Sequence, residues 1–283
     1  MYIVTRRKKI PFGKKTLLMG ILNVTPDSFS DGGLFLDPKK AIDHAMRMKI
    51  QGADIIDIGG ESVRIDASKV SVKEELRRIL PVLVGIREKL GNDIIISVDT
   101  YKSQVAEKAV EEGADIVNDT TGFQIDPKMP QVVGKTGTAV VVTHMRNRLG
   151  IHQESDDVVG DSSRFFKKQL DLCKTFDITK EQIILDPGYG FCKTLENNLK
   201  LIKHIDTFKT FRLPILIAVS RKASLGRILH KEFQSIMEYG IHERLTAALA
   251  ATAIGVLGGA SIVRTHDVYE TKNFITVLDK LRT

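Results

Sequence analysis

The chain has 283 residues, close to the roughly 250 that one α/β barrel needs, so its length does not require a second domain. It is 42% hydrophobic and 27% charged, and its two cysteines, Cys173 and Cys192, exclude a disulfide framework and lack metal-ligand spacing. The net charge is +7, with the densest basic cluster at Arg6–Lys9. We interpret that cluster as solvated surface rather than a nucleic-acid site, and a cationic surface also attracts small anionic substrates.

The amino-terminal segment shows no targeting signal. Met1–Phe12 is basic and has no apolar core of signal-peptide length, and no stretch of the chain approaches the 18 apolar residues of a membrane span. We therefore expect a cytoplasmic protein that makes no membrane contact. We also expect one domain over residues 1–283, with residues 1–15 as a cap under the fold and residues 16–283 as the fold itself.

From Leu17 onward, short β-branched runs alternate with longer amphipathic stretches. Each short run is apolar nearly throughout, as expected of parallel strands that are buried on both faces. The predicted strands are Leu17–Val24, Asp54–Ile58, Ile94–Asp99, Asp115–Asn118, Ala139–His144, Ile183–Asp186, Ile215–Ser220 and Ser261–His266. Eight such units predict an α/β protein made of a single (β/α)8 TIM barrel.

The intervening stretches have helical periodicity. They include Pro38–Gln51, Lys73–Leu90, Lys102–Glu112 and Glu243–Leu257, and each is followed by a glycine, where helices commonly stop. A Rossmann-like open sheet is the weaker alternative, because no Gly-x-Gly-x-x-Gly follows the first strand.

Polar residues stand at the carboxyl end of every predicted strand. They are Asn23, Asp57, Asp99, Asn118 with Asp119, His144, Asp186, Ser220 through Lys222, and Arg264 with His266. In a parallel barrel these ends face one way, so the side chains should converge on the carboxy-terminal mouth, where barrel active sites lie. The polarity of loops explains any one of these residues, but it explains the whole set poorly.

The residue types at the mouth suggest two kinds of binding group. Asp99, Asp186 and Asn118 suit a planar heterocycle that carries N–H groups. The donors suited to phosphate oxygens are Asn23, Arg64, Arg264 and His266.

A metal-dependent hydrolase is the rival interpretation of such a barrel. Hydrolases of this type carry a His-x-His pair on the first strand, where this chain has Asn23-Val-Thr25. Two mouth histidines, His144 and His266, are few for a tightly held transition metal. A weakly bound, substrate-bridging Mg²⁺ remains open, because it needs only one or two oxygen ligands and a phosphate.

The strand ends and loops also resemble a known family. Met19–Gly33, read as Met-Gly-Ile-Leu-Asn-Val-Thr-Pro-Asp-Ser-Phe-Ser-Asp-Gly-Gly, resembles the first-loop signature of dihydropteroate synthases. Further blocks follow in the family's order: Asp54–Ser62, Ile96–Thr100, Asp115–Asp119, Leu185–Phe191, Val219–Lys222 and Val263–Asp267. The resemblance runs from Met19 to Asp267, nearly the whole chain. It implies a transferase that condenses 6-hydroxymethyl-7,8-dihydropterin pyrophosphate with p-aminobenzoate in folate synthesis, and a target of sulfonamides.

The resemblance also implies roles for individual residues. The pterin ring would be held by Asp99, Asn118, Met145, Asp186 and Lys222. The pyrophosphate would be bound by Asn23, Arg264 and His266, and its charge neutralised by Arg264, His266 and Mg²⁺. The p-aminobenzoate would be bound by Phe29, Val63, Arg64, Phe191 and Ser220. Asn23 and Asp31 would position the Mg²⁺, and the catalytic set would be Lys222, Asp99, Arg264 and His266.

The sequence departs from the family's pattern on the amine side. Where members usually read Glu-Ser-Thr-Arg-Pro-Gly, this chain reads Glu61-Ser-Val-Arg-Ile-Asp66, and Ala223 replaces the serine that often follows Ser-Arg-Lys. Losing a hydroxyl bond to a charged group costs about 1.5–3 kcal/mol. Backbone N–H groups at the helix start after Lys222 offer a substitute. The pterin half is thus intact and the amine half altered.

Two other functions stay open on sequence alone. One is a pterin-binding relative with weak turnover, and the other is a corrinoid-dependent methyltransferase acting on methyltetrahydrofolate. The second is disfavoured by the complete first loop and by Arg264 with His266. Family members tend to be homodimers, and the alanine-rich Glu243–Leu257 fits an interface or a helix packed on the barrel equally well. Asp57 fits either a structural acceptor for loop amides or a direct substrate contact.

Overall fold

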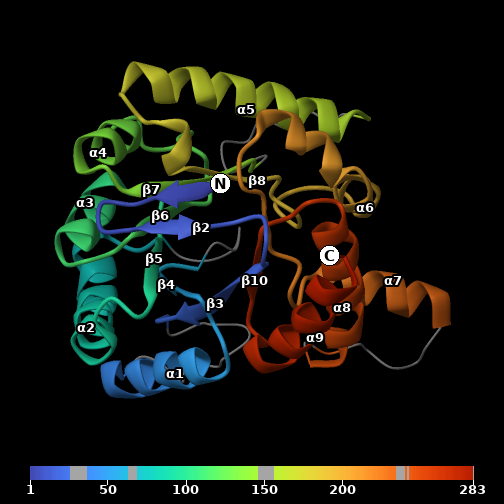
Figure 1. Ribbon diagram of the computed structural model, residues 1–283, viewed down its shortest axis with the longest axis horizontal. Helices are drawn as coiled ribbons and strands as arrows, with labels where there is room; N and C mark the ends of the chain where they lie inside the picture. The colour runs from blue at the N-terminus through green and yellow to red at the C-terminus, as the bar shows by residue number, and fades with distance from the viewer. Residues whose placement is uncertain (26–36, 63–68, 146–155, 234–239, 241, 283) are drawn as a thin grey trace.

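The computed structural model describes residues 1–25, 37–62, 69–145, 156–233, 240 and 242–282. From Leu17 onward, strands and helices alternate within these ranges, and the helices surround the strands as a ring (Figure 1).

The described ranges contain eight parallel strands in one sheet. They are β3 (Leu17–Asn23), β4 (Ile55–Gly59), β5 (Ile95–Asp99), β6 (Ile116–Asp119), β7 (Ala139–Thr143), β8 (Ile183–Asp186), β9 (Leu216–Ile217) and β10 (Ile262–Thr265). The hydrogen-bonded order is β8-β7-β6-β5-β4-β3-β10-β9, and a parallel bridge between Leu185 and Ile215 joins the two edges. This closure confirms the predicted TIM barrel.

Helices occupy the connections between these strands. They are α1 (Pro38–Ile50), α2 (Val72–Leu90), α3 (Ser103–Glu111), α4 (Met129–Thr136), α5 (Val158–Thr175), α6 (Leu195–Lys203), α7 (Ala223–Phe233), α8 (Leu245–Leu257) and α9 (Val268–Leu281), with 3-10 turns at Lys180–Gln182, Ile205–Phe211 and His242–Arg244. Local chemistry sets their starts, because Asp37 accepts from Lys39 N before Pro38 opens α1, and Ser71 accepts from Glu74 N at the start of α2. None of the helices in the described ranges has the length and apolar character to cross a membrane.

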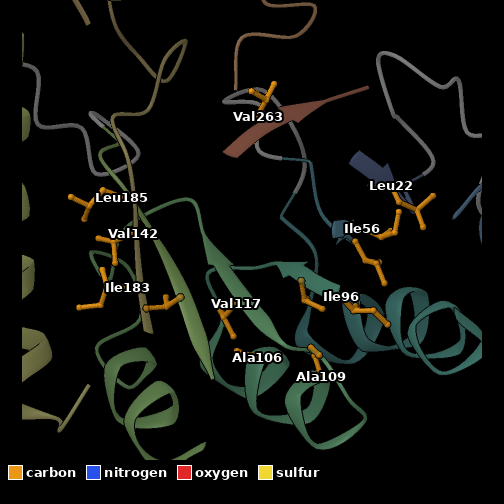
Figure 2. Packing of buried hydrophobic residues seen from close by; sticks show 14 of the residues in the cluster. Leu22, Ile56, Ile96, Ala106, Ala109, Val117, Val142, Ile183, Leu185 and Val263 are labelled. Atoms are coloured by element: carbon orange, nitrogen blue, oxygen red, sulfur yellow. The ribbon is translucent and has the colours of Figure 1, made fainter. Parts of the chain in front are cut away.

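The core has an inner and an outer layer, because successive strand residues point to opposite faces. One buried cluster fills the barrel interior and includes Leu17, Met19, Ile55, Ile95, Ile116 and Ala139. The other lies between strands and helices, as where Val117 of β6 approaches Ala106 and Ala109 of α3 (Figure 2). The same alternation decides which strand-end residues face the mouth.

A hairpin of β1 (Tyr2–Val4) and β2 (Lys9–Pro11) precedes the barrel, with Ile3 opposite Ile10. In Figure 1 this hairpin crosses the centre of the helical ring. Ile3 and Ile10 belong to the inner cluster together with Leu17, at the amino end of β3. The hairpin therefore covers the end of the barrel opposite the mouth, while the domain boundary at residue 15 stays a prediction.

Candidate active site

Hydrogen bonds link four side chains from four strands at the mouth. Arg264 of β10 donates from Nε to Asp57 Oδ2 of β4 at 2.6 Å and from Nη2 to Asp99 Oδ2 of β5 at 2.7 Å. Asp57 Oδ2 also accepts from Asn118 Nδ2 of β6 at 3.0 Å. Burial alone would lower the pKa of Arg264, but Asp57 and Asp99 outweigh it and raise that pKa. The mouth thus holds a permanent cation between two carboxylates.

Asn23 lies beside this group. In the sheet register Asn23 is opposite Gly59, and Gly59 is opposite Asp99. A methyl group built on Gly59 would lie 3.5 Å from Asn23 Oδ1 and 3.6 Å from Asp99 Cβ. The absence of a side chain at Gly59 therefore leaves Asn23 and Asp99 facing one space.

Asp186 and Lys222 form the neighbouring part of the mouth. Asp186 is buried at the end of β8 and its Oδ1 accepts from Gly188 N at 2.8 Å. Burial raises the pKa of Asp186, while Gly188 N–H and Lys222 act against that rise. The Lys222 ammonium lies 4.3 Å from the centre of the Phe191 ring. Acid, ammonium and aromatic ring thus adjoin at this part of the mouth.

The charge of Lys222 gives a testable pH dependence. Removal from water and, second, the nearby Arg264 lower the pKa of Lys222 to about 8, against the opposing effect of Asp186 and Asp99. The charged form is therefore lost as the pH rises through that value. If Lys222 acts in its charged form on the pterin substrate that the sequence predicts, kcat/KM for that substrate should fall about tenfold per pH unit above pH 8. Lys222→Arg, which stays charged, should lack this alkaline limb, and a wild-type profile flat through the same range would contradict the assignment.

Ser220 and His266 form hydrogen bonds within the protein at the end of the barrel. Ser220 Oγ donates to Asp267 Oδ2 at 3.3 Å and accepts from His266 N at 3.2 Å, and Asp267 pairs with Arg221 at 2.6 Å. Burial lowers the pKa of His266 well below its usual range, and Arg221 and Arg264 lower it further. The neutral form of the His266 imidazole is therefore favoured at neutral pH.

His144 does not belong to the mouth, so its interpretation as a mouth histidine was wrong. Its Nδ1 lies 2.6 Å from Ser162 Oγ and its ring centre 4.9 Å from that of Phe165, both on α5. The reason is strand alternation, because His144 has the same parity as the outward-facing Val140 and Val142. Asp119 also faces outward, where its carboxylate accepts from the backbone of its own loop at Thr121 and Phe123.

Several supporting residues were not found by sequence reasoning. Lys193 Nζ donates to the carbonyls of His144 at 2.7 Å and Gly188 at 2.8 Å, and Asn198 Oδ1 accepts from Gly190 N at 2.7 Å. These bonds fix the loop between Asp186 and Phe191. Lysine and asparagine in a loop or helix carry no sequence signal for such contacts.

Ser224 does not replace the serine missing at position 223. Its hydroxyl donates to Tyr189 OH at 2.9 Å, and both side chains are buried. Ala223 is exposed as the first residue of α7.

The remaining predicted residues divide into two groups. Met145 is 5% exposed and Phe191 7% exposed, so both are buried beside the mouth loops. The residues outside the described ranges are Phe29, Asp31, Val63 and Arg64. Within those ranges no three His, Cys, Asp or Glu residues gather in a way that could hold a metal ion.

The fold and the mouth together define an α/β-barrel enzyme whose strand ends bring buried acids next to cations. Comparison with known proteins identifies the family. The pattern of the family described as pterin binding enzyme matches residues 19–266. The chain is 40% identical to a dihydropteroate synthase of Synechocystis over 273 residues, which is 95% of this chain and 91% of that protein.

Solved structures agree with this match. The Clostridium difficile dihydropteroate synthase crystallised with pteroic acid superposes with a TM-score of 0.87 at 41% identity, covering 96% of this chain and 98% of that chain. The Yersinia pestis enzyme in complex with a sulfonamide drug superposes with a TM-score of 0.90 at 35% identity, covering 100% and 99%. The chain belongs to the dihydropteroate synthase family, whose members are transferases. The alternative of a corrinoid-dependent methyltransferase has no support among these relatives.

Proposed function

We propose that this mouth condenses 6-hydroxymethyl-7,8-dihydropterin pyrophosphate with p-aminobenzoate and releases pyrophosphate. The observation that carries the proposal is the arrangement of Asp99 and Asn118 around Arg264, with Asp186 and Lys222 beside them. Acceptors for ring N–H groups thus adjoin a cation for the leaving anion. The pteroic acid complex of the Clostridium difficile relative supports a site of this chemistry, since pteroic acid joins a pterin to p-aminobenzoate.

The proposed reaction begins at the pterin. The bond between the pterin methylene and the pyrophosphate oxygen breaks, and the oxygen leaves with the electron pair. Positive charge develops on the methylene and spreads into the ring, where the buried carboxylates of Asp99 and Asp186 stabilise it. The neutral amine of p-aminobenzoate then forms the new C–N bond and releases a proton. No nucleophilic side chain is required.

The leaving pyrophosphate gains negative charge as that bond breaks. Arg264 supplies a fixed positive charge and His266 a neutral N–H donor. We propose that Asn23 and Asp31 would hold a Mg²⁺ ion, whose positive charge would neutralise part of the charge of the pyrophosphate. A site with one amide oxygen at Asn23 fits an ion that takes most of its ligands from substrate and water.

The amine half of the proposed site rests on fewer described contacts. Phe191 lies under the Lys222 ammonium, and Ser220 is already bonded to Asp267. The backbone N–H groups at the start of α7 are suited to the carboxylate of p-aminobenzoate. We propose that Phe29, Val63 and Arg64 complete this slot.

Pyrophosphate release tests the proposal against a pterin-binding protein with weak turnover. Purified protein with Mg²⁺ and the pterin pyrophosphate is assayed with and without p-aminobenzoate. A synthase releases pyrophosphate in proportion to 7,8-dihydropteroate formed, and release depends on the amine. Pterin binding without amine-dependent release would favour the weak binder, and failure to bind pterin would remove the proposal.

Val63 predicts weaker inhibition by sulfonamides than in relatives with threonine at this place, because these drugs mimic p-aminobenzoate. A lost hydroxyl bond to a charged group is worth about tenfold or more in affinity. We expect Val63→Thr to lower the sulfonamide inhibition constant by about that factor. Inhibition constants measured on both proteins decide this, and equal values would contradict it.

We further propose a cytoplasmic homodimer that binds only small-molecule substrates. Helix α8 exposes Ile254 at 51% and Leu257 at 55%, on a helix made almost entirely of apolar residues. Such a face is stabilised by contact with a second copy. Sedimentation analysis of the unmodified protein and of Ile254→Glu tests this, since the substitution should shift a dimer toward monomer.

A further inference from the structure

Asp57 accepts hydrogen bonds from both halves of the mouth through a single oxygen. Its Oδ2 lies 2.6 Å from Arg264 Nε and 3.0 Å from Asn118 Nδ2, and the side chain is completely buried. We propose that Asp57 is a positioning residue that orients the pterin-reading amide of Asn118 and the anion-binding guanidinium of Arg264 at the same time. This inference deepens the proposed function and rests on it.

The sheet register places Asp57 behind the residues that face a ligand. Asn23, Gly59 and Asp99 are aligned across β3, β4 and β5, and Asn118 is aligned with Asp99. Asp57 precedes Gly59 by two residues, and it is aligned instead with Ile21 and Ser97. Asp57 therefore lies one layer of inward-facing side chains deeper in the barrel than Asp99 and Asn118. It would act on a ligand through Asn118 and Arg264, the side chains that it contacts.

The bond to Asn118 fixes which end of its amide meets a ligand. A carboxylate only accepts, so the group that Asn118 turns toward Asp57 is its NH₂. Its carbonyl oxygen then points away from Asp57 and can accept from a ring N–H. Without Asp57 the amide is free to turn over and place its own N–H groups against those of the ring.

The bond to Arg264 fixes the plane of the guanidinium. With Nε held by Asp57 and Nη2 held by Asp99, the planar group has no rotational freedom about its last bonds. Its remaining N–H groups then have one direction in which to meet an anion. Asp57 thus contacts both side chains that would meet the two ends of one substrate, and it shares Arg264 with Asp99.

The test measures each ligand separately. Calorimetry gives the affinity for 6-hydroxymethyl-7,8-dihydropterin and for inorganic pyrophosphate with Mg²⁺, and kinetics give KM for p-aminobenzoate. We expect Asp57→Ala to weaken the first two by about tenfold or more each and to leave KM for the amine within about twofold. Asp57→Asn keeps an oxygen acceptor without the charge. It should restore pterin affinity to within about threefold of the unmodified protein and leave pyrophosphate binding weakened, because a neutral acceptor holds Arg264 less firmly.

Asp115 offers a matched control. It is also completely buried and pairs with an arginine, Arg87, at 2.8 Å, but it precedes β6 at the opposite end of the barrel. Asp115→Asn should lower stability without changing any of the three ligand constants.

The outcomes separate the two proposals. If the unmodified protein binds neither ligand, the proposed function fails. If it binds both and folded Asp57→Ala binds them equally well, the inference about Asp57 is overturned. If Asp57→Ala does not fold, the measurements on Asp57→Asn decide. An equal weakening of the binding of all three ligands by Asp57→Asn, or no weakening of any, would overturn the positioning role.

Discussion

Replacing Arg264 with alanine should lower kcat/KM by about a thousandfold and destabilise the fold by about 3–5 kcal/mol. The activity falls because the leaving anion loses its fixed cation. The stability falls because Asp57 and Asp99, at 0% and 7% exposure, are left as buried carboxylates without their shared partner. Urea unfolding and steady-state kinetics measure the two effects independently.

Arg264→Lys is the control for this substitution. It restores one positive charge, but a compact ammonium cannot reproduce the two bonds that the planar group makes in fixed directions. We expect most of the stability to return while kcat/KM stays at least about tenfold below the unmodified value. If Arg264→Ala unfolded at the same urea concentration as the unmodified protein, Arg264 would not be stabilising the carboxylates.

The barrel was predictable from sequence because its signals are local. Apolar strand runs and helix-ending glycines gave the element order, and Gly52, Gly91 and Gly113 all have positive φ in the structure. The seventh strand shows the limit of this reasoning. It was predicted over Ile215–Ser220, yet only Leu216–Ile217 forms β9, because the chain then turns, with Lys222 N bonded to Val219 O at 3.3 Å. Strand pairing depends on neighbours that a single run of residues does not reveal.

The sequence predicted most of the residues that lie at the mouth, but not the hydrogen bonds that join them. The strand-end argument selected Asp99, Asn118, Asp186 and Arg264 correctly as neighbours in space. It also selected His144, although the alternation of side chains along β7 already placed that ring outward. The sharing of Asp57 between two strands requires the register of β4, β6 and β10, which the sequence does not state.

Gly188 should be the least replaceable residue of the loop after β8. Its φ is +72°, and a Cβ added there would lie 2.2 Å from the carbonyl oxygen of His144, which is backbone and cannot swing aside. Its N–H also holds Asp186 Oδ1 at 2.8 Å. We expect Gly188→Ala to cost about 2–4 kcal/mol, as left-handed backbone strain and overpacking combine. Pterin affinity should fall by about tenfold or more, because the clash displaces the loop and moves the N–H of residue 188 away from Asp186.

A substitution at Gly137 distinguishes the cost of backbone strain from the cost of overpacking in the loss of stability expected for Gly188→Ala. Gly137 has nearly the same backbone angle, φ +68°, at the end of α4, but a Cβ there would meet nothing within 4 Å. Gly137→Ala should therefore cost only the backbone strain, about 1 kcal/mol, and leave pterin binding unchanged. Denaturant unfolding and pterin titration of both variants make the comparison. Equal losses of stability would mean that the close approach to His144 is relieved at no cost, and the loop would then not be fixed by that contact.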